Sequence, residues 1–481
     1  MSKISKSFKK FPKTFWSANT MELFERWAWY GMFMVLALYL TGSRDEGALG
    51  FTQSQKGILM GTVVAILYFL PVVTGALADK YGYKKVLLIS FTILSTGYFI
   101  MPFFTTYISV FIAFLYVAIG AALFKPIIAA TVSQTTDDSN SSIGFGIYYM
   151  MVNIGAFIAP LIAAKLRILN WSYVFYMSAA IISLNFLLVL FFYKEPFVEK
   201  KKESLSKTFK TIFNNIFIAL SDIKFVIFLI IIIGFWTMYN QLFYTLPNFI
   251  DQWVDTRVLY DSIASFSPRL ASAVGNIHGT INPEVLTDID AGYIIIFQVL
   301  ISSLVMKFKP LNAMISGFFI STLGLSLTFA FNNPFYLFIT ILIFSVGEMS
   351  SSPKITEYIG KIAPRDKVAL YMGCSFLPMA GGNFFAGILS GGVYGSMSDK
   401  ITLLQRYISE KGLSIPAISD SFTQNDYINR ACELLGVDKY TLTSNLWNQY
   451  HPQRIWYVFA GIGMFTVIAL FLYDRLLLSK K

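Results

Sequence analysis

Histidine, cysteine and charged residues are scarce in this chain, and each shortage reduces the number of functions that the protein can have. The 481 residues include two histidines and two cysteines, and only 14% are charged. His278 and His451 fall in loops, so no imidazole is left inside the apolar segments to carry a proton. Cys374 lies in an apolar segment and Cys432 in a loop, so we expect no disulfide between them. Any proton transfer within the apolar segments must therefore use carboxylates.

Long apolar runs indicate that the solvent around the chain is a lipid bilayer. Hydrophobic residues make up 55% of the sequence, and the mean hydropathy is +0.59. A bilayer core is about 30 Å thick and offers no backbone hydrogen-bond partners, so each crossing segment should be an α-helix. We therefore predict an all-α membrane protein with about twelve spans. They are expected near residues 15–41, 56–78, 85–104, 107–132, 143–165, 172–193, 224–250, 290–307, 311–331, 334–361, 368–392 and 454–476.

The excess of basic residues follows membrane topology. The formal net charge is +11, and the lysines and arginines concentrate in alternate short loops and at both ends of the chain. The intervening loops at 105–107 and 332–334 carry none. Because basic loops stay in the cytoplasm, we expect both termini there and no nucleic-acid partner. The first span is too long and too charged for a cleavable signal.

The spans divide into two halves of six, as in many secondary transporters. We expect an N-terminal bundle at 1–193, a basic cytoplasmic linker at 194–223 and a C-terminal bundle at 224–481. Two long insertions, 251–289 and 395–453, are expected to cap the outer face. In the second insertion, "ITLLQRYISE" and "NDYINRACELLG" are typical of short amphipathic helices. A purely structural covering role is the simplest interpretation of both insertions.

Few ionisable residues lie well inside the spans. They are Glu22, Glu25, Arg26, Lys125 and Glu348. Charges in lipid are costly, so these side chains should face one another or a water-filled cavity. Glu22, Arg26, Trp29 and Tyr30 share one side of a helix, and Lys125 lies at the depth of Glu22. This arrangement predicts a Glu–Arg–Lys cluster, with an isolated structural salt bridge as the alternative.

Six motifs, in order along the chain, resemble those of one transporter family. Glu22-x-x-Glu25-Arg26 followed by Tyr30-Gly31 is similar to the E-x-x-E-R-F-x-Y-Y-G signature of proton-coupled oligopeptide transporters, a branch of the major facilitator superfamily. "GALADKYGYKK" resembles the superfamily's conformational loop motif through Gly75, Asp79 and Gly82. The remaining four are "FKP" at 124–126, "YYMMVNIGAF" at 148–157, "FWTMYNQ" at 235–241 and "GEMSSSPK" at 347–354.

The resemblance implies a major facilitator fold and import of di- and tripeptides by proton symport. It implies a monomer in the cytoplasmic membrane, driven by the proton gradient, with peptide and protons as partners and with no cofactor, metal site or catalytic residue. Lys125 would meet the peptide carboxylate and Glu348 its ammonium group. Proton coupling is expected at Glu22, Glu25, Arg26 and Lys125. Substrate binding is expected at Tyr30, Tyr68, Lys125, Asn153, Trp236, Asn240 and Glu348. Once a glutamate is protonated, Lys125 is free to leave Glu22 and take the peptide carboxylate.

The sequence departs from the family pattern at four positions, which keeps alternatives open. Phe33 replaces a usual Arg, Asn240 a usual acid, Ile127 an Asn, and Ile301 begins the stretch where an Asn-Pro is usual. A transporter of the same fold for another zwitterionic, anionic or peptide-like solute is therefore the main alternative. An enzyme or receptor is disfavoured because the spans contain no Ser-His-Asp set or histidine-rich metal set. A channel fits poorly with one cation and one anion at opposite ends of a cavity.

Overall fold

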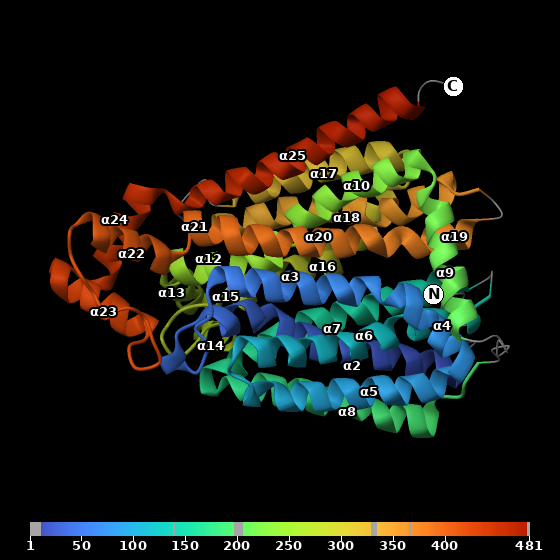
Figure 1. Ribbon diagram of the computed structural model, residues 1–481, viewed down its shortest axis with the longest axis horizontal. Coiled ribbons are helices and arrows are strands. Elements are labelled where there is room, and N and C mark those ends of the chain that lie inside the picture. Colours follow the sequence, from blue (N-terminus) through green and yellow to red (C-terminus); the bar gives the residue numbers. More distant parts are fainter. Residues whose placement is uncertain (1–10, 138–139, 197–204, 329–333, 365–366, 479–481) are drawn as a thin grey trace.

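The computed structural model is an elongated bundle of α-helices (Figure 1). It describes residues 11–137, 140–196, 205–328, 334–364 and 367–478. Within these ranges no strand is formed apart from one isolated bridge between Gly275 and Ile281. The all-α expectation is confirmed, and Cys374 and Cys432 are both free thiols, as expected.

Seven helices from the first part of the chain lie together in the lower half of Figure 1. They are α2 (Lys13–Thr41), α3 (Gln53–Phe69), α4 (Pro71–Tyr81), α5 (Tyr83–Ile100), α6 (Tyr107–Gln134), α7 (Ser141–Leu169) and α8 (Trp171–Leu187). Local sequence sets their ends. Thr52 and Gln55 form a capping box at the start of α3, and Pro71 opens α4. Gly82, with φ at +93°, separates α4 from α5 in a conformation that favours glycine.

The long helices of the second part of the chain form the upper half of Figure 1. Its long helices are α10 (Ile223–Tyr239), α16 (Ile289–Val305), α17 (Pro310–Leu327), α18 (Tyr336–Ile362), α20 (Leu377–Ile388) and α25 (Ile455–Tyr473). Shorter helices in this part are α11 (Gln241–Tyr244), α12 (Leu246–Trp253), α13 (Arg257–Phe266), α14 (Pro268–Val274), α15 (Pro283–Thr287) and α19 (Val368–Gly373). Helix α9 (Leu205–Leu220) lies in the segment that joins the two parts.

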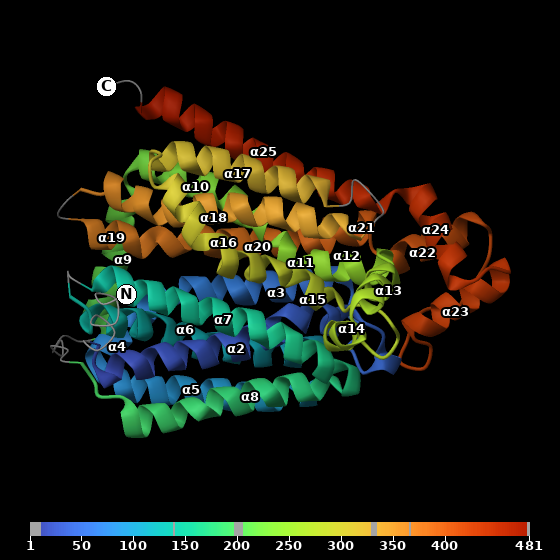
Figure 2. The same ribbon diagram turned by 180° about the vertical axis from the view of Figure 1, so that it is seen from behind.

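By length and composition, the described helices account for ten or eleven of the twelve expected spans. Ten described segments are long and apolar enough to cross a membrane, and the bent pair α3–α4 makes an eleventh. Helix α2 has 29 residues and runs beside the others in Figures 1 and 2. Its four charged residues, Lys13, Glu22, Glu25 and Arg26, lower its hydropathy, which explains why composition alone does not select it. We count α2 as the twelfth span.

Two hydrophobic cores hold the molecule together. Buried side chains between Phe11 and Tyr193, joined by Tyr244, form one cluster, and those between Ala219 and Tyr473 form the other. Within the first cluster α2 packs on α7 and α8, and within the second α17 packs on α18 and α25. Lipid provides no hydrophobic drive between helices, so this packing depends on close fit.

Small residues let the two parts meet along α3 and α20. A β-carbon built on Gly57 would lie 2.7 Å from the Cα of Gly391, and one on Gly387 would lie 2.6 Å from the Cα of Gly61. Real side chains essentially never approach so closely, so only glycine fits at these positions. Nearby, the buried Lys56 ammonium donates to the Tyr244 carbonyl at 2.8 Å. These contacts close one end of the space between the two parts.

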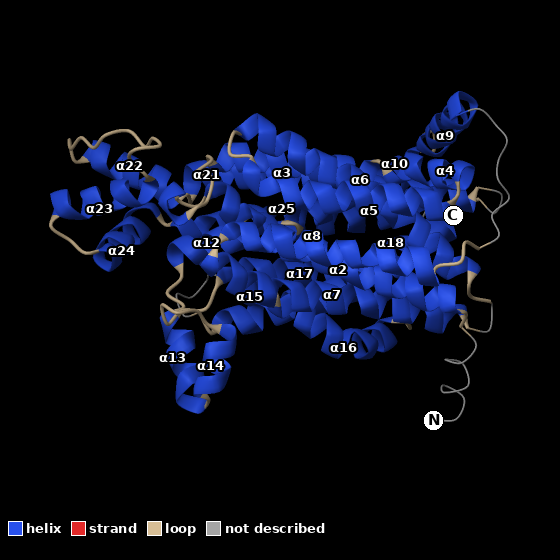
Figure 3. Cartoon of the chain, turned by 90° about the horizontal axis from the view of Figure 1, so that it is seen from below, coloured by secondary structure: helices blue, strands red, loops and turns tan. Residues whose placement is uncertain are grey.

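That closed end also carries the insertions. Helices α21 (Tyr394–Met397), α22 (Lys400–Glu410), α23 (Gln424–Leu435) and α24 (Lys439–Tyr450) lie there, and we call residues 394–453 the cap. Figure 3 shows the cap and the α13–α14 pair as separate projections from the same end. Helices α4, α9 and α19 lie at the opposite end, which we call the terminal end (Figure 1). The two amphipathic helices expected in the cap are present as α22 and α23, whereas α24 was not anticipated.

Polar contacts tie the cap to the first part of the chain. The Asn425 side chain donates to Asp45 at 2.9 Å and to Glu46 at 2.8 Å. Arg44 forms an ion pair with Asp420. The cap therefore bridges both parts at the closed end.

Candidate functional site

A central cavity of about 270 Å³ lies between the two parts of the chain. Helices α2, α3 and α7 form one wall, and α10, α16, α18 and α20 form the other. Six residues predicted to bind substrate line it: Tyr30, Tyr68, Asn153, Trp236, Asn240 and Glu348. The sequence motifs that carry these residues are scattered over more than 300 positions, and the fold brings them to one chamber.

The charged cluster of α2 lies beside this cavity rather than in its wall. Arg26 Nε is 3.3 Å from Glu22 Oε1 and donates to Glu25 Oε2 at 2.5 Å. All three side chains are buried, and none lines the cavity. The Arg26 guanidinium lies 5.9 Å from the ring centroid of Tyr30, which does line it. Tyr30 therefore connects the ionic cluster to the chamber.

Lys125 takes a different partner from the one predicted. Its ammonium nitrogen lies 4.2 Å from the ring centroid of Tyr68, a cation–π contact. The predicted ion pair with Glu22 is not formed, and the cation beside that carboxylate is Arg26. Lys125 still interacts electrostatically with Glu22 and Glu25. Lys125 is not among the described residues that line the cavity, but its partner Tyr68 is.

The opposite wall carries more acid than the sequence suggested. Glu348 on α18 is joined by Asp290 in the first turn of α16 and by Asp288 just before it. The Ser345 hydroxyl donates to Asp290 at 2.5 Å. Sequence reasoning missed both aspartates because the expected span began at residue 290, where an acid resembles an ordinary helix-start residue. The available signal was "TDIDAGY", two acids directly before a long apolar run.

The departures from the family pattern fall into two groups. Phe33 and Asn240 both line the cavity, and the Phe33 ring lies 6.3 Å from that of Phe243. The Asn240 side-chain amide donates to the Trp236 carbonyl at 2.8 Å. Asparagine is uncharged, so this position needs no ionic partner. Ile127 is buried in the first core, and neither it nor Ile301 is part of the described lining.

The loop-motif residues Gly75, Asp79 and Gly82 lie at the terminal end, away from the cavity. The Tyr83 hydroxyl donates to Asp79 at 3.3 Å, and the Tyr83 backbone N–H donates to the Glu195 carboxylate. These contacts join α4, α5 and the start of the connecting segment. A mechanical role is consistent with this position, and direct substrate contact is not.

No group of three or more His, Cys, Asp and Glu residues in the described ranges is arranged to hold a metal ion. The cavity wall instead offers aromatic rings, amides and carboxyl groups. Such a surface binds an organic cation or zwitterion through charge and stacking.

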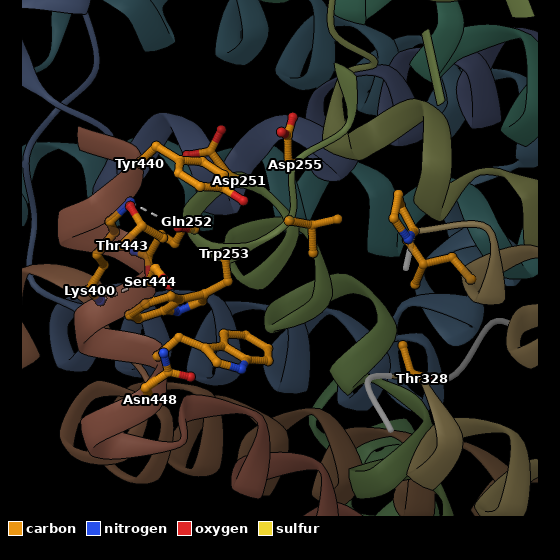
Figure 4. Close-up of a pocket in the computed structure, with 14 residues that line it drawn as sticks. Asp251, Gln252, Trp253, Asp255, Thr328, Lys400, Tyr440, Thr443, Ser444 and Asn448 are labelled. Atoms are coloured by element: carbon orange, nitrogen blue, oxygen red, sulfur yellow. Dashed lines mark hydrogen bonds between the residues drawn. The ribbon is translucent and has the colours of Figure 1, made fainter. Parts of the chain in front are cut away.

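A second pocket of about 340 Å³ lies under the cap (Figure 4). Asp251, Trp253, Lys400 and Tyr440 line it, and the Lys400 ammonium donates to the Gln252 carbonyl at 3.1 Å. None of the residues predicted from the motifs takes part. The central cavity is therefore the candidate site.

Comparison with known proteins agrees with this architecture. The profile of the Major Facilitator Superfamily matches residues 20–281. A "Di-/tripeptide transporter" of Lactococcus lactis subsp. lactis is 26% identical over 265 residues, which covers 53% of this chain and 51% of that protein. A "Dipeptide and tripeptide permease A" of Citrobacter koseri is 31% identical over 180 residues, covering 36% and 34%. The chain thus spans about half or less of the length of these relatives.

Solved structures give a match over nearly the whole chain. A crystal structure of "peptide transporter POT in complex with sulfate" has a TM-score of 0.72 at 16% identity, covering 97% of this chain and 94% of that one. A "POT family transporter in complex with 5-aminolevulinic acid" has a TM-score of 0.67 at 18% identity, covering 97% and 98%. At these identities the likeness concerns the fold. The predicted major facilitator fold is confirmed.

Proposed function

Because the chain belongs to the major facilitator superfamily, a family of transporters rather than enzymes, we propose that it is a proton-coupled symporter of di- and tripeptides. Two of the relatives that match its sequence are named for di- and tripeptide transport. Membrane-spanning helices and a central chamber are what a carrier requires. We propose a monomer that works by alternating access in the cytoplasmic membrane.

One observation carries the proposal: a carboxyl group lines one wall of the central cavity, and a lysine lies behind a tyrosine of the other wall. Glu348 lies on one wall, and the Tyr68–Lys125 pair lies at the other. A peptide backbone carries an ammonium group and a carboxylate at a limited separation, so such a cavity selects it by its ends. Trp236, Tyr30 and Asn153 supply stacking and hydrogen bonds between these ends.

Proton coupling is proposed to work through the α2 cluster. Arg26 holds Glu22 and Glu25, while Lys125 rests on Tyr68. Protonation of a glutamate changes the field at Lys125, which interacts with both carboxylates. Lys125 then turns from the tyrosine ring to the peptide carboxylate. Proton binding and peptide binding thereby favour the same state.

The two halves are proposed to rock about the cavity. Residues 1–193 and 224–481 move as units, and 194–223 is the linker. The two separate hydrophobic cores support this division. The contacts at the cap end define a state closed on that side. Helix α4 lies at the terminal end (Figure 1), and Lys80 in its last turn with Lys84 and Lys85 after it support a cytoplasmic location for that end.

Flux measurements in proteoliposomes test the proposal. Labelled dialanine should accumulate when an inward proton gradient is imposed and should only equilibrate without one. Glu22→Gln should abolish accumulation and leave counterflow exchange intact, because exchange needs no net proton movement. Glu433→Gln, in an exposed ion pair on α23, is the matched control and should behave as wild type. Accumulation by Glu22→Gln at the wild-type level would refute the coupling scheme.

A carrier of another peptide-like solute remains the second candidate, favoured by one observation. Phe33 and Asn240 both face the cavity, where the family pattern has a charged pair. If di- and tripeptides fail to compete with the transported solute, this second candidate replaces the first.

A further inference from the structure

Three carboxyl groups gather on one side of the central cavity. Asp288, Asp290 and Glu348 all line it, and their residues are 2%, 5% and 9% exposed. Asp288 immediately precedes α16, and Asp290 lies in the first turn of that helix. Glu348 lies midway along α18, which packs against α16. We call these three residues the acidic wall.

The acidic wall is short of hydrogen-bond donors. Asp288 Oδ2 and Glu348 Oε2 are buried and have no partner among the described residues. Asp290 receives the Ser345 hydroxyl, and its carboxyl group lies within reach of the Glu348 carboxyl. An unpaired buried carboxylate is costly, so these oxygens require a proton or a cationic ligand.

The protein does not supply that cation. No lysine, arginine or histidine is among the described residues that line the cavity. Lys125 lies beyond Tyr68 on the other wall, and Arg26 is held by its own two glutamates. A single peptide ammonium group at Glu348 neutralises one carboxylate and leaves Asp288 Oδ2 without a partner.

We propose that the acidic wall receives two positive charges from the solute, so that the transporter prefers peptides with a cationic first residue. Glu348 takes the terminal ammonium group, and Asp290 with Asp288 takes the cationic side chain. This inference rests on the proposed peptide transport and adds a substrate class to it. Asp290 and Asp288 are then specificity-determining residues.

The preference is measured by competition in proteoliposomes. Uptake of labelled dialanine is inhibited with unlabelled Lys-Ala, Ala-Ala or Glu-Ala. We expect Lys-Ala to inhibit at about tenfold lower concentration than Ala-Ala, since a hydrogen bond to a charged group adds about one power of ten. Glu-Ala should inhibit least, because a carboxylate faces the acidic wall. This comparison uses only the wild-type protein, so its result does not depend on whether a variant folds.

Variants then assign the preference to a residue. Asp290→Asn should bring Lys-Ala and Ala-Ala to equal potency as inhibitors, and Asp290→Glu should keep the preference. Asp261→Asn, exposed on α13, is the matched control and should not alter it.

The outcomes separate this inference from the proposed function. Equal inhibition by Lys-Ala and Ala-Ala in wild type would overturn the inference and leave peptide transport standing. A preference that survives in both Asp290→Asn and Asp288→Asn would overturn the assignment to the acidic wall. Absence of dialanine uptake would instead overturn the proposed function.

Discussion

Replacing Gly387 with alanine should weaken the closed state at the cap end. The new methyl carbon would lie 2.6 Å from the Cα of Gly61 across the α3–α20 contact. Carbon atoms prefer separations of about 3.5 Å or more, so the helices must part by about 1 Å. Overpacking of this kind costs about 1–3 kcal/mol. Because the clash exists only while α3 and α20 touch, the equilibrium should shift about 5- to 150-fold toward opening.

Spin-label distances measure this shift. Labels are placed at Ser54→Cys on α3 and Ser396→Cys on α21, two exposed positions on opposite sides of the contact, with Cys374 and Cys432 replaced by serine. Gly387→Ala should enlarge the long-distance population. Gly392→Ala is the matched control, because a β-carbon there meets nothing within 4 Å. If the two variants give the same distance distribution, the rocking scheme at this contact is wrong.

Three further predictions follow from the ionic and polar contacts. Lys125→Gln should reduce gradient-driven dialanine uptake at least about tenfold, because a charge-assisted bond to the peptide carboxylate is lost; wild-type uptake rates would contradict this role. Arg26→Met should lower stability by about 3–5 kcal/mol, since it leaves buried carboxylates unpaired. Thermal melting in detergent measures the loss, and Arg430→Met, in an exposed pair, should change little. Asn425→Ala should increase the distance between the labels at Ser54 and Ser396, because it removes two hydrogen bonds between the cap and the first half. An unchanged distance distribution would show that the cap does not hold the two halves together.

Much of the fold was accessible from sequence because lipid imposes strict rules. Each span must be helical and apolar, so twelve long runs were visible without any tertiary information. The broken span at Pro71 and the charged span α2 followed the same rule despite their irregular composition. Helix α24 was missed because its polar sequence, "KYTLTSNLWNQY", gives a weak apolar pattern.

The candidate site was predicted less completely, for physical reasons. Six expected residues meet at the cavity because each lies on an inward helix face fixed by its motif. The partner of Lys125 depended on competition between a cation on the same helix as Glu22 and one on a different helix. Arg26, four residues from Glu22, lies 3.3 Å from that carboxylate, and the Lys125 ammonium lies over the Tyr68 ring. Sequence spacing does not decide such a competition.

Asp290 shows a second limit of sequence reasoning. Acids at helix starts are common on protein surfaces, so its pattern did not indicate a cavity. Its place in the cavity wall depends on where α16 begins relative to α18, which is a tertiary property. A charged residue at the edge of a span can therefore indicate a cavity as well as one at the centre of a span.

A structure determined with bound dialanine tests the central claim most directly. The account predicts one peptide in the central cavity, with its ammonium group within hydrogen-bond distance of Glu348 and its carboxylate on the Tyr68–Lys125 side. Peptide bound only in the pocket beneath the cap, with none between the two halves, would contradict the account.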